Sequence, residues 1–318
     1  MMRPTTTPWM GVLAISTLIA SGVADAQQAP TRQPVPRQPV NTQPAAQIAR
    51  QTAQAPARAP FELTPAQAAQ LDRLLLEWEA QSSNTKTLEC QFKRFKYDLA
   101  GAPAGIFASA SAGKIKYASP DKGMFRVDQQ VFYKGMKANK PEHGPNKGQF
   151  GEHWVCNGKE VIEFDRSEKK CHIELLPPNL QGQGIINSPL PFVFNLKAAD
   201  IKARYWVRQV GAPKPGLLMI EAWPKRQQDR AQYKLVQIVL KEETYEPAGL
   251  VLYAPNFDVV KAPHKDIYEF VEVKRNGALA SMQMFMKNFI PEKPPSDWKI
   301  FRNDFNPAAQ AGPSGQRG

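Results

Sequence analysis

The sequence has few of the features that mark enzyme active sites. It contains no Gly-x-Ser-x-Gly elbow, no Walker phosphate loop and no dinucleotide-binding fingerprint. Its four histidines, His143, His153, His172 and His264, show no metal-ligand spacing, and the neighbours Cys171 and His172 would point to opposite faces of a strand. We therefore expect no catalytic residue, no metal site and no cofactor.

Long apolar runs are also scarce. The run from Trp9 to Ala20 is followed by Ala24-Asp25-Ala26, a pattern typical of a cleaved signal peptide over residues 1–26. No cysteine follows this run, so lipid attachment is not indicated. We expect a soluble protein in the periplasm or elsewhere outside the cytoplasm. The alternative is a cytosolic protein with an apolar N-terminal helix.

Cysteine is rare, with three residues in the chain: Cys90, Cys156 and Cys171. An oxidising compartment permits a disulfide. However, Cys156 and Cys171 fall on strands that we expect to lie two apart, roughly 9–10 Å, which exceeds disulfide reach. Buried free thiols are the favoured prediction, and pairing of Cys90 with one of the other two is the alternative.

Acidic residues are outnumbered, with 29 Asp and Glu against 41 Lys and Arg and a formal net charge of +12. Residues 27–60 have four arginines and no acid in a Gln/Pro/Ala-rich context, which predicts an extended, disordered linker. A similar composition predicts a disordered tail over residues 307–318. The basic charge suits anionic lipid headgroups or envelope polyanions, and export argues against nucleic acid.

The remaining residues, 61–306, are rich in strand signals. Asn157-Gly158 between two short apolar runs predicts a hairpin with a type I′ turn, because both central residues of that turn need positive φ. The polar residues 166–170 predict a second turn. Residues 113–117 and 125–133 alternate with period two, which indicates half-buried antiparallel strands.

We predict one domain with ten or more antiparallel strands and few helices. The first strand starts near Leu88, and a change of apolar phase at Lys93-Arg94 predicts a bulge there. Later strands are predicted at about residues 106–118, 124–134, 152–156, 160–165, 171–176, 204–210, 216–223, 232–242, 249–254, 266–274 and 279–288. Residues 135–151 are expected to form a long, basic loop.

Two helices are predicted. The first starts with Thr64 as N-cap, Pro65 at the first helical position and Gln67 completing a capping box. Its apolar residues fall on one stripe suited to covering a sheet. They are Leu71, Leu74, Leu75 and Trp78. The second, shorter helix is predicted within residues 190–203, after Ser188-Pro189.

Three methionines could line a binding site. Met282, Met284 and Met286 would share one face of the predicted strand 279–288, and flexible thioethers suit irregular acyl chains. The alternative is ordinary core packing. Likewise, the lysines of residues 134–148 could dock on anionic lipid or be solvated.

The order of these motifs resembles the periplasmic lipoprotein-carrier family with the LolA/LolB fold, and also a planctomycete-type family of exported proteins. The segments that carry the resemblance are Leu88-Glu89-Cys90-Gln91-Phe92, Gly113-Lys114-Ile115-Lys116-Tyr117-Ala118-Ser119-Pro120, Met124-Phe125-Arg126-Val127, Asn157-Gly158-Lys159 with Phe164-Asp165, and Ser188-Pro189-Leu190-Pro191-Phe192-Val193-Phe194. It extends over about residues 66–290.

The resemblance implies an α+β fold, in which a strongly curved antiparallel sheet forms an incomplete barrel and helices cover its open face. It also implies a monomer that binds an acyl chain or acylated protein in the hollow between them. By position, Phe125, Val127, Phe192 and Val193 would line this cavity. Ser119 stands where the carriers have the arginine that holds the lid closed, so the resemblance does not extend to that lid contact.

From these patterns we expect an exported, non-catalytic lipid-binding protein. One alternative is an envelope sensor or adaptor that binds a protein partner. The other is a hydrolase that acts through carboxylates, for which Glu163, Asp165, Glu174 and Glu221 are the candidates.

Overall fold

The computed structural model describes residues 59–176, 197–277 and 282–303. All of them lie in one compact unit, residues 52–318. The predicted signal peptide, the linker to residue 58, the tail from residue 307, and the predicted cavity residues Phe192 and Val193 lie outside the described residues.

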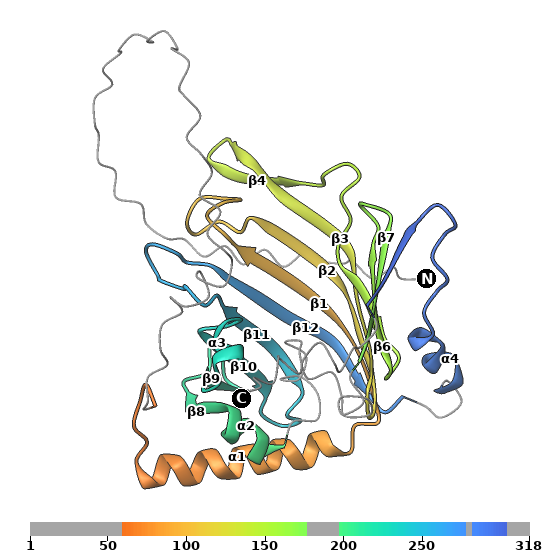
Figure 1. The fold of residues 1–318 in the computed structure, drawn as a ribbon. Helices are drawn as coiled ribbons and strands as arrows, with labels where there is room; N and C mark the ends of the chain where they lie inside the picture. The colour runs from red at the N-terminus through yellow and green to blue at the C-terminus, as the bar shows by residue number, and fades with distance from the viewer. Residues whose placement is uncertain (1–58, 177–196, 278–281, 304–318) are drawn as a thin grey trace, which may run out of the picture. The chain divides into compact units, whose positions relative to one another are not determined.

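Thirteen strands form a single sheet (Figure 1). The strands are β1 Thr87–Tyr97, β2 Ser109–Ala118, β3 Lys122–Lys137, β4 Lys140–Gly144, β5 His153–Cys156, β6 Glu160–Asp165, β7 Lys170–Leu175, β8 Tyr205–Val210, β9 Leu217–Pro224, β10 Leu235–Lys241, β11 Pro247–Tyr253, β12 Lys265–Arg275 and β13 Lys299–Asn303. Their order is β13-β7-β6-β5-β3-β2-β1-β12-β11-β10-β9-β8, with β4 paired to β3.

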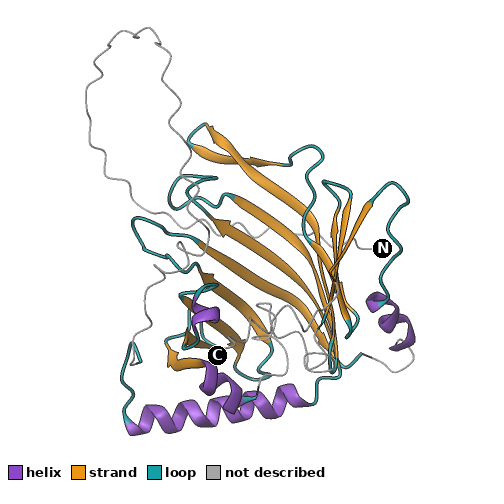
Figure 2. Ribbon diagram, in the orientation of Figure 1, coloured by secondary structure: helices purple, strands orange, loops and turns teal. Residues whose placement is uncertain are grey.

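The sheet is open, because its path begins at β13 and ends at β8. Its described pairings are antiparallel except that of β13 with β7, and it curves around one face (Figures 1 and 2). The predicted fold class, a curved antiparallel incomplete barrel with few helices, is confirmed. None of the described helices combines the length and apolar composition needed to span a membrane.

Helix α1 (Pro65–Ser83) packs on the face around which the sheet curves, here called the inner face. The Thr64 hydroxyl accepts a hydrogen bond from the Gln67 N–H, and the Gln67 side chain accepts one from the Thr64 N–H, so the predicted capping box is present. The predicted apolar stripe is buried in the main core. This core joins α1 to inner-face residues of β1, β2, β3 and β8 to β12.

Two further helices are short: α2 (Ala198–Arg204) and α3 (Gln227–Arg230). The carboxylate of Glu79 on α1 accepts a hydrogen bond from the Ala198 N–H at 2.9 Å, which satisfies a free donor at the start of α2. Lys202 and Asp72 pair at 2.7 Å between the same two helices. These contacts hold α2 against α1.

A smaller second core lies on the outer face of β3, β5, β6 and β7. Helix α4 (Met282–Met286) and the 3-10 helix η4 (Lys287–Phe289) cover it, with Phe289 buried and Phe285 and Met286 packed against it. The two cores use opposite faces of one strand, because Met124 belongs to the outer core and its neighbour Phe125 to the inner one.

The predicted strand 279–288 is wrong, because residues 282–289 are helical. The Met-Gln-Met-Phe-Met sequence suggests period two, but methionine is also a good helix former. Phe285 and Phe289, four residues apart, lie on one side of the helical segment with ring centroids 5.5 Å apart. This spacing brings both rings to the outer core.

The bulge predicted at Lys93-Arg94 is also wrong. β1 pairs with β2 without interruption, and the register shifts against β12 instead, where Glu272 has φ of +51°. Phe95 and Tyr97 lie on the outer face around Phe107. The apparent change of phase arose because this stretch carries aromatic residues on its outer face and a charged residue on its inner one.

Two strands were missed. β4 falls in the predicted loop 135–151, has no large apolar residue, and pairs only with the end of β3. β13 is exposed throughout and joins an edge in parallel. The hairpin predicted at Asn157-Gly158 is present, but Gly158 (φ +94°) is the first central residue of the turn, as in type II′.

All three cysteines are free and buried, as favoured from the sequence. Cys90 lies in the main core and Cys171 in the outer core. The Cys156 thiol donates to the Asp121 carbonyl at 3.3 Å. Burial raises the pKa of Cys90 to about 12 and raises the pKa of the other two.

Leu75 and Leu76 test the packing of α1, because they are adjacent and differ in burial, with 1% and 60% of their surfaces exposed. Leu75→Ala should lower the free energy of unfolding by about 2–5 kcal/mol. Leu76→Ala should change it by less than about 0.5 kcal/mol. Urea denaturation followed by circular dichroism measures both, and equal losses would contradict the packing described.

Candidate functional site

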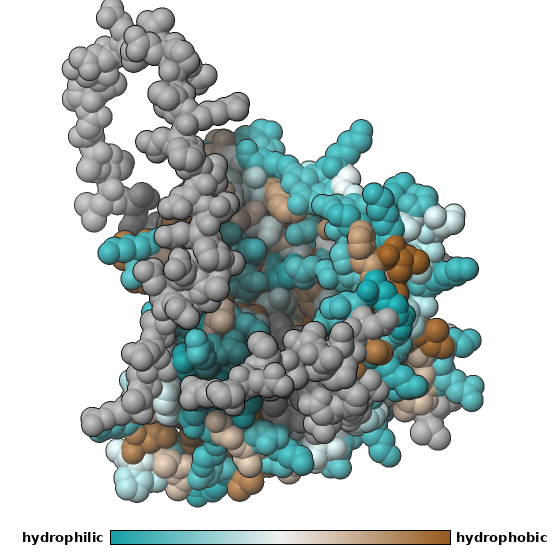
Figure 3. All heavy atoms as spheres, viewed as in Figure 1, coloured by the Kyte–Doolittle hydropathy of each residue, from teal (hydrophilic) through white to brown (hydrophobic). Residues whose placement is uncertain are grey.

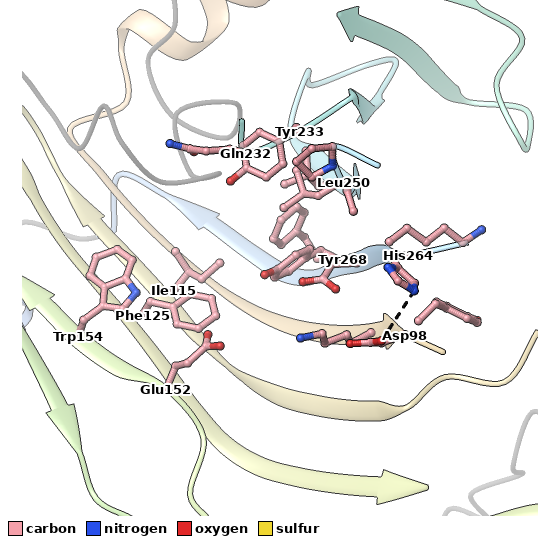
Figure 4. Close-up of a pocket in the computed structure, with 18 residues that line it drawn as sticks. Asp98, Ile115, Phe125, Glu152, Trp154, Gln232, Tyr233, Leu250, His264 and Tyr268 are labelled. Carbon is pink, nitrogen blue, oxygen red and sulfur yellow. Dashed lines mark ion pairs between the residues drawn. The ribbon is translucent and has the colours of Figure 1, made fainter. Parts of the chain in front are cut away.

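A cavity of about 480 Å³ opens on the inner face of the sheet (Figure 4). Strands β1, β2, β3, β5, β11 and β12 and the loops beside them line it. Its apolar lining consists of Ile115, Phe125, Trp154, Leu250, Leu252 and Phe270. Its polar lining includes Lys96, Asp98, Glu152, Gln232, Tyr233, His264, Asp266 and Tyr268. Figure 3 shows a hollow on this side of the molecule, surrounded largely by hydrophilic residues.

An aromatic stack forms one end of the cavity. Phe125 on β3 stacks on Phe92 of β1 with centroids 4.7 Å apart, and on Trp154 of β5 at 5.9 Å. Phe125 and Trp154 are directly opposite each other in the antiparallel pairing. Such cross-strand neighbours on one face lie close enough for their side chains to pack. Phe125 and Trp154 therefore present an apolar surface to the cavity, and Phe92 is buried behind them.

A buried cation lies beside this stack. Arg94 projects from β1 with 11% of its side chain exposed, and its Nη1 donates to both carboxylate oxygens of Glu152, at 2.8 and 3.0 Å. Its guanidinium carbon is 5.9 Å from the ring centroids of Phe125 and Tyr268. Burial raises the pKa of Tyr268 to about 12 despite the nearby arginine, so its phenol is neutral at pH 7.

Asp266 is a half-buried acid in the cavity lining, opposite Lys96 in the pairing of β1 with β12. Burial raises the pKa of its carboxyl group, and the positive charges of Arg94 and Lys96 only partly offset this effect. At the other end of the cavity, His264 and Asp98 approach to 3.8 Å across the mouth (Figure 4). The cavity thus has an aromatic end, where Glu152 is paired with Arg94, and a charged mouth.

Only some of the sequence-predicted site residues lie at the cavity. Phe125 lines the cavity, and Val127 lies in the same core but is not in the lining. Phe192 and Val193 are outside the described residues. Helix α4 contains the three predicted methionines, and it packs on the outer face, opposite the cavity.

Sequence reasoning missed most of the lining. From the sequence, Trp154 is only a member of the predicted strand 152–156, and Arg94 only marks a change of apolar phase. Leu250, Leu252, Tyr268 and Phe270 alternate on β11 and β12, but alternation alone does not say which face is hollow. The four carboxylates considered for a hydrolase do not line this cavity, and Glu221 instead pairs with Arg208 at 2.7 Å.

Within the described part of the chain, no cluster of three or more histidine, cysteine or acidic side chains has the geometry to hold a metal ion.

No protein-family model and no curated protein matches the sequence. Solved structures do resemble the chain. An uncharacterized conserved protein from Thermus thermophilus is 10% identical with a TM-score of 0.40, over 74% of this chain and 100% of that one.

Two further structures carry related descriptions. A domain described as a putative outer membrane lipoprotein-sorting protein from Vibrio parahaemolyticus is 10% identical with a TM-score of 0.32, over 70% of this chain and 98% of that one. A LolA superfamily protein from Nitrosomonas europaea is 8% identical with a TM-score of 0.30, over 66% and 96%. The likeness of this chain to each of them is one of fold alone.

The raised pKa of Asp266 predicts a pH-dependent stability. The native carboxyl holds its proton to higher pH than the unfolded one, whose pKa is about 3.9, so stability from this group is complete below that pH and is lost as pH rises through the folded pKa. Asp266→Asn should therefore raise the free energy of unfolding relative to wild type at pH 7 and leave it nearly unchanged at pH 3.

Urea unfolding at both pH values measures this difference. Glu269→Gln, on an exposed neighbouring position of β12, is the control and should show no such dependence. An equal effect of Asp266→Asn at both pH values would contradict the prediction.

Proposed function

We propose that this protein binds the acyl chain of a lipid or of an acylated protein in the cavity on the inner face, outside the cytoplasm and without chemical conversion. The observation that carries the proposal is the polarity of the cavity, which has an aromatic and aliphatic end and a charged mouth. An amphiphilic ligand has the same division, with an apolar chain and a polar head. The cavity volume falls within the roughly 300–1,000 Å³ typical of small-molecule sites.

In this proposal the chain of the ligand lies against Phe125, Trp154 and Phe270, and its polar end lies toward Asp98 and His264. Burying apolar surface supplies the binding free energy, at about 25 cal/mol per Å² removed from water. The Arg94–Glu152 pair keeps a buried charge compensated beside the apolar end. The roles of Phe192, Val193 and the α4 methionines stay predictions from the sequence.

A dansyl-labelled fatty acid tests the proposal. We expect saturable binding of about one probe per chain, with energy transfer from tryptophan to dansyl that falls in Trp154→Phe, because Trp154 lines the cavity. Trp154→Glu should weaken binding at least about tenfold, since it places a charge at the apolar end beside Glu152.

Met286→Glu is the matched control, because Met286 is also half-buried but packs on the outer face. Unchanged binding by this variant is expected. Weakened binding would indicate that the α4 methionines belong to the binding site. Failure of the wild-type protein to take up the probe, together with no lipid in its organic extract by mass spectrometry, would reject acyl binding in favour of the protein-binding alternative.

A further inference from the structure

The loop between β11 and β12 presents an apolar tip. Val259 and Val260 are each 77% exposed, the highest values among the large hydrophobic side chains of the described residues. The tip is ordered by hydrogen bonds. The Asp258 Oδ1 accepts from the N–H groups of Val260 and Lys261 at 2.9 and 2.8 Å, and Asp258 and Ala262 exchange backbone hydrogen bonds. The hydrogen-bonded turn therefore keeps two adjacent aliphatic side chains exposed to solvent.

This tip stands at the cavity mouth. Ala254 and Pro255 at one end of the loop, and His264 and Lys265 at the other, line the cavity. The Ala254 N–H donates to the His264 carbonyl, which closes the base of the loop. His264 faces Asp98 across the mouth (Figure 4). Whatever the tip contacts is thus brought next to the opening.

Lysines surround the tip. Lys234 donates to the Phe257 carbonyl at 2.8 Å, and Lys265 lies over the ring of Tyr97 at 5.3 Å. Neither these two nor Lys261 forms an ion pair within the part of the chain that the structure describes. Asp258 is the one acid of the loop, and His264 pairs with Asp98. Lys261 within the loop and Lys234 beside Phe257 therefore outnumber the single acid of the loop.

A second tip of the same character lies at this end of the sheet. β3 continues past Phe132, which is opposite the first residue of β2, and turns back as β4 (Figure 1). Met136 is 55% exposed there. The neighbouring cations are Lys134, Lys137 and Lys140, of which Lys137 pairs with Glu142 at 3.7 Å. The registers place this hairpin and the β11–β12 loop at the same end, because Tyr97 of β1 is opposite Lys265.

We propose that these two tips dock the cavity mouth on an anionic lipid bilayer, with Val259 and Val260 entering the boundary between headgroups and acyl chains. Lys234, Lys261 and Lys265 then lie at the level of the anionic headgroups, which attract juxtaposed lysines. Apolar side chains ringed by cations complement a charged membrane surface better than a neutral one. This inference rests on the proposed function, since docking would let an acyl chain pass between the bilayer and the cavity.

Vesicle cosedimentation of the full chain tests the docking. Vesicles of phosphatidylcholine with about one-third phosphatidylglycerol should bind the wild-type protein at least about tenfold more tightly than phosphatidylcholine alone, and less tightly as salt rises. The double variant V259S/V260S, and separately K234Q/K261Q, should each lose about tenfold. Val271→Ser is the control, because Val271 is 41% exposed on β12, away from the mouth.

Depth is measured with Val260→Trp, whose emission should be quenched by lipids brominated along the acyl chain. Equal binding to both vesicle types, or no loss in V259S/V260S, would overturn the docking and point to a protein surface as the partner of the tip. The dansyl fatty acid separates the two proposals. V259S/V260S should bind this soluble probe as the wild type does, so loss of vesicle binding alone leaves the acyl site standing.

Discussion

The rest of the structure depends on how the helices cover the inner face of the sheet. Apolar side chains project from eight strands onto this face. The stripe of α1 and two residues of α2 pack against them, yet no residue of α1 lines the cavity. The strands that the helix does not cover carry the same alternation, and Phe92, Phe125 and Trp154 stack on one another there. Part of the apolar inner face is therefore left open as the lining of the cavity.

The charged groups of the inner face follow from the same constraint. A charge on an apolar face must be paired or neutralised, because its desolvation is costly. Arg94 meets this demand through Glu152, Ser111 and two aromatic rings. Asp266 lies opposite Lys96, and burial still raises the pKa of its carboxyl group. Asp266 lines the cavity, and Arg94 contacts three residues of the lining, Glu152, Phe125 and Tyr268.

The sequence predicted the antiparallel strands around Asn157-Gly158, the capping box of α1 and most other strands, because period-two patterns and caps are local signals. It did not predict the face that each strand presents. Phe95 and Arg94 show why, since an aromatic residue lies outward and a cation inward on one strand. The Met282–Met286 segment failed for a related reason: its alternating letters fit a strand, but its contact with the outer core fits a helix. Edge strands β4 and β13 carry no burial pattern and give no local signal.

The rates at which the buried thiols become accessible can report how this protein unfolds. The thiolate is the species that reacts with alkylating agents, and burial keeps Cys90 and Cys171 protonated and covered. The two residues lie in different cores, one under α1 and the other under α4 and η4. Their separate labelling rates would show whether the two faces of the sheet open together or whether the small outer core opens while the inner one stays closed.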